Sequence, residues 1–142
     1  MKNILCFGDS NTWGYDVTTF DPAIGSGQRM PFDVRWPGRV QNLLGSEYRI
    51  IEDALNARTV MNQDPYFPHR LGIAGLEAAL DAHAPLDLVI IKLGVNELKH
   101  ILSDMEKEMK QAAKDLEFEK AAALRDQIYE LRGMLADLTD VE

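Results

Sequence analysis

Cysteine, basic residues and long apolar runs are scarce in this sequence of 142 residues. The single cysteine, Cys6, cannot form a disulfide within the chain, and its place in an apolar run predicts a small core residue. Acidic residues outnumber basic ones by 23 to 15, which disfavours nucleic-acid binding because phosphate contacts need a basic surface. No segment approaches the roughly 20 apolar residues of a membrane span, and no signal peptide is visible. We therefore expect a cytoplasmic protein without nucleic-acid or membrane partners.

Proline is absent from residues 101–142, and glycine occurs there once, at Gly133. Residues 1–100 contain all six prolines and the other nine glycines. The later segment is rich in Ala, Glu, Lys, Leu and Met, and it has six basic against eleven acidic residues. This exchange of chain-breaking residues for helix formers predicts two domains, 1–100 and 101–142.

The first domain alternates strand-like and helix-like segments, which predicts an α/β fold. The expected parallel sheet has three strands in the order 2-1-3, with helices on its faces. The third apolar run, 88–91, does not alternate with polar residues, so we expect it to be covered on both faces. Three strands are few, and the C-terminal segment or another subunit is expected to cover the outer edge. Strands are expected near residues 3–7, 48–52 and 86–93, and helices near 36–45 and 71–83.

The second domain is expected to be an antiparallel α-helical hairpin. The capping-box pattern at 103–106 predicts that a helix begins at Ser103. The apolar stripe of this helix loses its phase near 115–118 and restarts at Ala121, which indicates two helices rather than one. Two helices bury little apolar surface alone, so we expect packing against the sheet or against a second copy.

Four segments of the first domain share a wider pattern. They are Ile4-Leu5-Cys6-Phe7-Gly8-Asp9-Ser10-Asn11-Thr12-Trp13-Gly14, Asp33-Val34-Arg35-Trp36, residues 51–59 and residues 85–97. Over residues 1–99 they resemble the N-terminal half of the SGNH (GDSL) hydrolases, in the arylesterase branch. The resemblance implies a flavodoxin-like sheet and serine esterase or acyltransferase chemistry.

The resemblance assigns roles to individual positions. Ser10 matches the nucleophile, and its backbone N–H also matches an oxyanion-hole donor. Ala57 matches a residue that donates a backbone N–H, and Asn96 matches the side-chain donor. Such donors each lower the barrier by roughly 2.7–4 kcal/mol. Glu97 departs from the aspartate of the family.

Several residues in the sequence segments around the proposed site could contribute either to the substrate pocket or to the structure. Asp9 and Trp13 are candidates for the substrate pocket, which would take a small ester or acyl ligand. Trp13 and Trp36 either line an acyl pocket or pack as ordinary aromatic residues. Neither a metal site nor a cofactor is expected. Arg58 either orients a loop or forms an ion pair with Asp9, Glu52 or Asp53.

The general base of the family, a histidine in an Asp-x-x-His block, has no counterpart in this sequence. Its histidines are His69, His83 and His100, and a serine without a base is a weak nucleophile. His100 is the nearest substitute because it follows the third strand, and its alternative is a surface position. The sequence predicts a scaffold without efficient esterase activity or, alternatively, an esterase whose base comes from His100 or another subunit.

The run from Leu116 to Ile128, Leu-Glu-Phe-Glu-Lys-Ala-Ala-Ala-Leu-Arg-Asp-Gln-Ile, resembles the UVR domain of excinuclease subunits B and C. The resemblance covers residues 101–135, and its alternative is a generic amphipathic hairpin. It implies a hairpin that pairs with another copy, so we expect a homodimer. The junction of the two parts is either a natural fusion or an engineered chimera. The expected partner-binding residues are Phe118, Ala121, Leu124 and Ile128.

Overall fold

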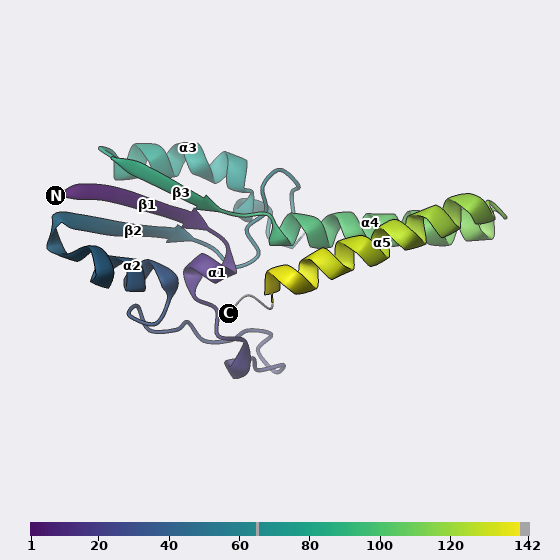
Figure 1. The fold of residues 1–142 in the computed structure, drawn as a ribbon, viewed down its shortest axis with the longest axis horizontal. Helices are drawn as coiled ribbons and strands as arrows, with labels where there is room; N and C mark the ends of the chain where they lie inside the picture. Colours follow the sequence, from purple (N-terminus) through teal and green to yellow (C-terminus); the bar gives the residue numbers. More distant parts are fainter. Residues whose placement is uncertain (65, 140–142) are drawn as a thin grey trace. The chain divides into compact units, whose positions relative to one another are not determined.

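The computed structural model describes residues 1–64 and 66–139. The chain divides into two compact units, Met1–Leu93 and Gly94–Glu142. The strands described lie in the first unit, and two long helices form the described part of the second (Figure 1). Each unit therefore has its own kind of secondary structure, as the change in composition predicts.

The sheet of the first unit contains β1 (Lys2–Gly8), β2 (Tyr48–Ala54) and β3 (Leu88–Lys92). The three strands are parallel and lie in the order β2-β1-β3. In this register Ile4 lies between Ile50 and Leu88. The predicted α/β fold and strand order are confirmed, and β1 occupies the centre because its residues are apolar toward both faces.

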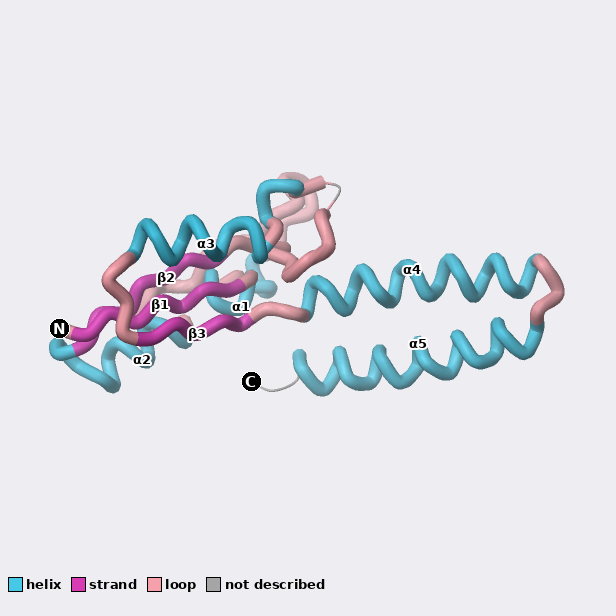
Figure 2. Tube along the Cα trace, turned by 90° about the horizontal axis from the view of Figure 1, so that it is seen from above, coloured by secondary structure: helices cyan, strands magenta, loops and turns pink. Residues whose placement is uncertain are grey.

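Helices cover the two faces of the sheet. Helix α2 (Trp36–Leu44) lies on one face, and α3 (Gly72–His83) lies on the other (Figures 1 and 2). Successive residues of β1 point to opposite faces, so each helix meets its own part of the core. The α2 side is built on Ile4, Cys6 and Ile50, and the α3 side on Leu5, Phe7 and Ala79.

The outer strand β3 is less buried than its sequence predicts. Leu88 is 50% exposed and Ile91 is 54% exposed, and their odd spacing places them on opposite faces of the sheet. The expected burial of β3 on both faces is therefore wrong for the single chain. The reason is its place at the edge, because the aromatic and aliphatic residues of α2 pack mainly against β1 and β2.

Between β1 and α2 the chain forms a long irregular segment apart from two short helical turns. The first is α1 (Ser10–Trp13), which directly follows the strand. The second is a 3-10 turn at Val17–Thr19. Further 3-10 turns lie at Gly45–Glu47 and Pro68–Arg70.

The second unit is the predicted antiparallel hairpin of α4 (Val95–Lys114) and α5 (Phe118–Thr139) (Figure 2). The predicted start at Ser103 is wrong, because α4 begins eight residues earlier. Gly94, with φ 127°, caps the helix directly after β3, and no proline or glycine interrupts the chain from there to Ser103. Long as α4 and α5 are, their charged residues leave no described helix with the apolar stretch that crossing a bilayer requires.

Candidate active site

Ser10 is the first residue of α1, at the point where the central strand ends. The Asp9 carboxylate is buried and accepts a hydrogen bond from the Asn11 N–H at 3.0 Å, so it caps the helix. A Cβ atom at Gly8 would lie 2.1 Å from the Thr12 hydroxyl oxygen. Glycine at the strand end therefore allows α1 to fold back and present Ser10, which is half-buried.

Ala57 lies in the turn that follows β2, with a left-handed φ of 59°. This conformation is rare for a residue with a side chain and costs roughly 1–2 kcal/mol. Among the residues that the structure describes, none accepts a hydrogen bond from the Ala57 N–H. Ala57 thus combines a strained backbone with an N–H that has no acceptor among the described residues.

The Arg58 guanidinium is buried and connects the ends of β1 and β2. Its Nη1 donates to the carbonyl oxygens of Gly8 at 3.2 Å and Asp53 at 2.8 Å. Its Nη2 donates to Asp53 Oδ1 at 2.9 Å, which confirms the ion-pair interpretation for this acidic residue. The guanidinium also lies 3.9 Å from the centre of the Phe7 ring. These contacts fix the strand ends next to Ser10.

The Glu52 carboxylate anchors the long segment after α1. It accepts hydrogen bonds from Arg35 Nε at 2.9 Å and Nη2 at 2.6 Å, and from Arg29 Nη2 at 3.1 Å. Arg29 Nε in turn donates to the Trp13 carbonyl oxygen at 2.7 Å, and its guanidinium lies 5.1 Å from the Trp13 ring centre. Glu52 therefore positions Trp13, three residues after Ser10. The sequence carries no local signal for this role, because the two arginines lie 17 and 23 residues from Glu52.

Two of the three histidines lie in the first unit. His83 Nε2 lies 3.5 Å from Asp53 Oδ2 at the end of α3, and the His69 ring contacts Phe67 edge-on at 6.4 Å. Within the described part of this unit, neither histidine hydrogen bonds to the Ser10 hydroxyl. The described residues also hold no group of three or more His, Cys, Asp or Glu side chains that could bind a metal ion.

The remaining site positions are in the second unit. Asn96, Glu97 and His100 all lie in the first two turns of α4. In the hairpin, the partner-binding candidates differ in accessibility. Phe118 is 65% exposed, Ala121 and Leu124 are half-buried, and Ile128 is 5% exposed.

Trp36 and Cys6 lie together on the α2 side of the sheet. The Trp36 ring packs against the cluster that contains Cys6, which agrees with the interpretation of Trp36 as a packing residue. Burial, with a smaller contribution from the Glu52 charge, raises the pKa of the Cys6 thiol from 9.0 to about 11. Cys6 is therefore an unreactive core residue at neutral pH.

Comparison with known proteins identifies a different similarity for each part. Residues 99–133 match the UvrB/uvrC motif. Among solved structures, the M. smegmatis aryl esterase has 43% identity and a TM-score of 0.64 over 69% of this chain. A carbohydrate acetylesterase from Sinorhizobium meliloti has 42% identity and a TM-score of 0.63, also over 69% of the chain. The comparison with curated proteins gives no match.

This chain spans 44% of the length of each of those two esterases. The predicted architecture of two parts is confirmed: an esterase-like α/β unit is followed by a UvrB/uvrC-type hairpin. The site around Ser10 lies within the esterase-like part.

Proposed function

We propose that the first unit is a scaffold that can be acylated at Ser10 but turns over esters inefficiently, and that the hairpin joins it to a second copy. The observation that carries the first half is the environment of the Ser10 hydroxyl. In the described part of the first unit it has no hydrogen bond to an imidazole, and His83 is next to Asp53 instead. A serine without a base is a poor nucleophile, although oxyanion donors alone leave residual catalysis.

The alternative is a serine esterase that acts through Ser10. The capped serine of α1 and the strained Ala57 favour it, since both are features of an acyl-transfer site. The base would be His100 or a group from another subunit. Attack would form a bond from Ser10 Oγ to the acyl carbon and break the bond to the alcohol, which would leave with the proton that the base takes from Ser10. Water would then cleave the acyl-Ser10 ester, release the acid and return the proton to Ser10.

Hydrolysis of p-nitrophenyl acetate by the wild type and by Ser10→Ala separates these alternatives. We expect a burst of p-nitrophenolate of about one equivalent per chain that forms slowly, because acylation lacks a base, and a still slower phase after it, because water must attack the acetyl-Ser10 ester without one. Ser10→Ala should lack the burst, and mass spectrometry should find the acetyl group on Ser10 of the wild type. Continuous turnover that requires both Ser10 and His100 would establish the esterase. Equal rates in wild type and Ser10→Ala would exclude chemistry at Ser10.

Self-association is supported by apolar surface in two places. The turn between α4 and α5 exposes Leu116 by 72% and Phe118 by 65%. The outer strand exposes Leu88 and Ile91 on the two faces of a sheet edge, and such edges readily pair with other chains. We propose the hairpin as the main contact between two copies and the β3 edge as a second one.

Light scattering across a micromolar concentration series tests this assembly. The wild type should have the mass of a dimer, and Phe118→Glu should shift it toward the monomer. Ile91→Lys reports separately on the sheet edge. A wild-type monomer throughout the series would exclude the proposed dimer.

We also propose that the two parts have separate origins and were fused near residue 99. Each part is similar to a different class of protein, and the match to the UvrB/uvrC motif begins at residue 99, a few residues after the boundary between the two compact units. A cytoplasmic location fits the single buried thiol. Fractionation of cells followed by immunodetection of the chain tests the location, and recovery outside the cytoplasmic fraction would exclude it.

A further inference from the structure

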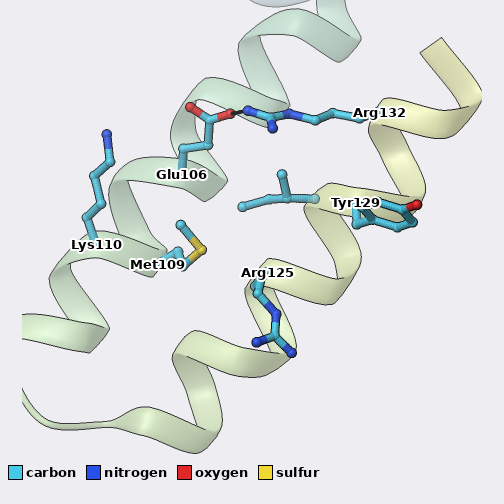
Figure 3. A pocket seen from close by; sticks show the side chains of 7 residues that line it. Glu106, Met109, Lys110, Arg125, Tyr129 and Arg132 are labelled. Carbon is cyan, nitrogen blue, oxygen red and sulfur yellow. Dashed lines mark hydrogen bonds and ion pairs between the residues drawn. The ribbon is translucent and has the colours of Figure 1, made fainter. Parts of the chain in front are cut away.

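The second unit contains a groove between α4 and α5, here called the hairpin groove. It consists of two hollows of about 340 and 320 Å³ that share Met109, Lys110 and Arg125. Figure 3 shows Met109 between the two helices and the ion pair of Glu106 with Arg132 across them. The remaining lining residues are Ala113, Phe118, Ala121, Ala122, Ile128 and Tyr129.

The charge of the hairpin groove is opposite to that of the segment that forms it. Residues 101–142 contain six basic and eleven acidic side chains. Three of the basic ones, Lys110, Arg125 and Arg132, line the groove, but only one acidic residue, Glu106, does. Cations are thus concentrated at an apolar groove in an otherwise acidic hairpin.

Two of these cations are available to a partner. Arg132 is paired with Glu106, which closes one end of the groove. Among the residues that the structure describes, Arg125 forms an ion pair with its exposed neighbour Asp126 alone, and such an exposed pair contributes little in water. Within the described residues, Lys110 has no ion-pair partner. Lys110 and Arg125 both line the part that the two hollows share, so their positive charges lie near the middle of the hairpin groove.

We propose that the hairpin groove binds an acidic amphipathic α-helix of another protein. The α5 residues that line the groove extend from Phe118 to Arg132, a length of about 21 Å along the helix axis. A partner helix of about 14 residues has the same length. Apolar side chains at every third or fourth position would contact Met109 and the alanines. Carboxylates beside them would pair with Lys110 and Arg125.

A second copy of this chain is a poorer occupant of the same groove. Two-fold pairing of groove on groove would place both copies of Lys110 and Arg125 along one seam, where like charges repel. Contact between the groove and a different face of the next copy would repeat without closing. The inference therefore goes beyond the proposed dimer, and it does not require activity at Ser10.

Fluorescence anisotropy with designed peptides tests the inference on the full chain. The probe is a labelled helix of about 18 residues with leucines at helical spacing, flanked by glutamates. Its counterpart has lysines in place of the glutamates. We expect saturable binding of the glutamate peptide that weakens between about 50 and about 300 mM salt. The lysine peptide should bind with an affinity at least roughly tenfold lower than that of the glutamate peptide.

Variants locate the binding site. Lys110→Glu and Arg125→Glu should each weaken the glutamate peptide by roughly tenfold. Ala113→Trp should block the groove without a change in charge. Lys107→Glu is the matched control, because Lys107 is 74% exposed on α4 and does not line the groove. Light scattering of each variant reports self-association separately.

Four results would overturn the inference. They are equal affinity for both peptides, equal effects of the variants at 107 and 110, absence of saturable binding up to about 1 mM, and loss of a dimer caused by Lys110→Glu. The last result would assign the groove to a second copy. If the chain is a monomer by light scattering but still binds the glutamate peptide, the proposed dimer is excluded and the inference about the hairpin groove stands.

Discussion

Replacement of Leu116 by glycine should stabilise the hairpin, although glycine usually destabilises helical structure. Leu116 has a left-handed φ of 62° directly after α4. The Glu117 N–H donates to the Ala112 carbonyl oxygen at 2.9 Å, and the Leu116 N–H donates to that of Ala113 at 3.3 Å. These two bonds form the Schellman motif, in which the left-handed position normally belongs to glycine.

The size of the effect follows from two opposing contributions. A left-handed backbone costs a residue with a side chain roughly 1–2 kcal/mol, which glycine does not incur. Glycine loses more backbone entropy on folding, which costs roughly 0.5–1 kcal/mol. The Leu116 side chain is 72% exposed, so its removal sacrifices little burial. The expected net gain in the free energy of unfolding is about 0.5–1 kcal/mol.

Urea unfolding followed by circular dichroism at low protein concentration measures this gain. Leu116→Ala keeps the strained backbone and should leave the stability nearly unchanged. Ala123→Gly, at an exposed position inside α5, should lose about 1 kcal/mol. If Leu116→Gly destabilises the hairpin as much as Ala123→Gly does, the argument from backbone strain is refuted.

Four further changes test the first unit and the hairpin. Folding raises the pKa of Cys6 from 9.0 to about 11, so the thiol of the unfolded chain loses its proton at a lower pH than that of the folded chain. The free energy of unfolding should therefore fall by about 2–3 kcal/mol between pH 9.0 and about 11. Urea unfolding of Cys6→Ala should show a smaller fall over the same range. Glu52→Gln leaves two arginines without their carboxylate and should cost about 2–3 kcal/mol, with faster proteolysis of residues 15–35 than in the exposed control Glu47→Gln. Gly8→Ala forces α1 away from β1 and should cost about 1–3 kcal/mol in urea unfolding. Gly133→Ala meets no atom within 4 Å and should stabilise α5.

The sheet could be predicted from the sequence because its signals are continuous along the chain. The apolar run of β1 ends at Gly8, and the helix-like segments between the strands require parallel crossovers. The same reasoning places Ser10 at the end of the central strand. The burial of β3 could not be predicted, because exposure depends on which neighbours α2 and α3 reach and not on the composition of the strand.

The start of α4 and the arrangement around Glu52 illustrate a second limit. The pattern at 103–106 is compatible with a helix interior as well as with a helix start, because Ser103 tolerates both positions. Only the left-handed Gly94 after β3 decides between them. Glu52 and its two arginines are 17 and 23 residues apart in sequence, so no local pattern identifies their contact.

The hairpin groove depends on the turn more than on any local pattern. Lys110 and Arg125 come together only because α4 ends at Lys114 and the chain reverses within three residues. The Schellman bonds at Leu116 set the register in which Arg132 meets Glu106 across the helices. A longer turn would rotate α5 and separate these charges. A glycine at 116 keeps the bonds, so it should raise the stability of the hairpin while the affinity for the glutamate peptide stays unchanged.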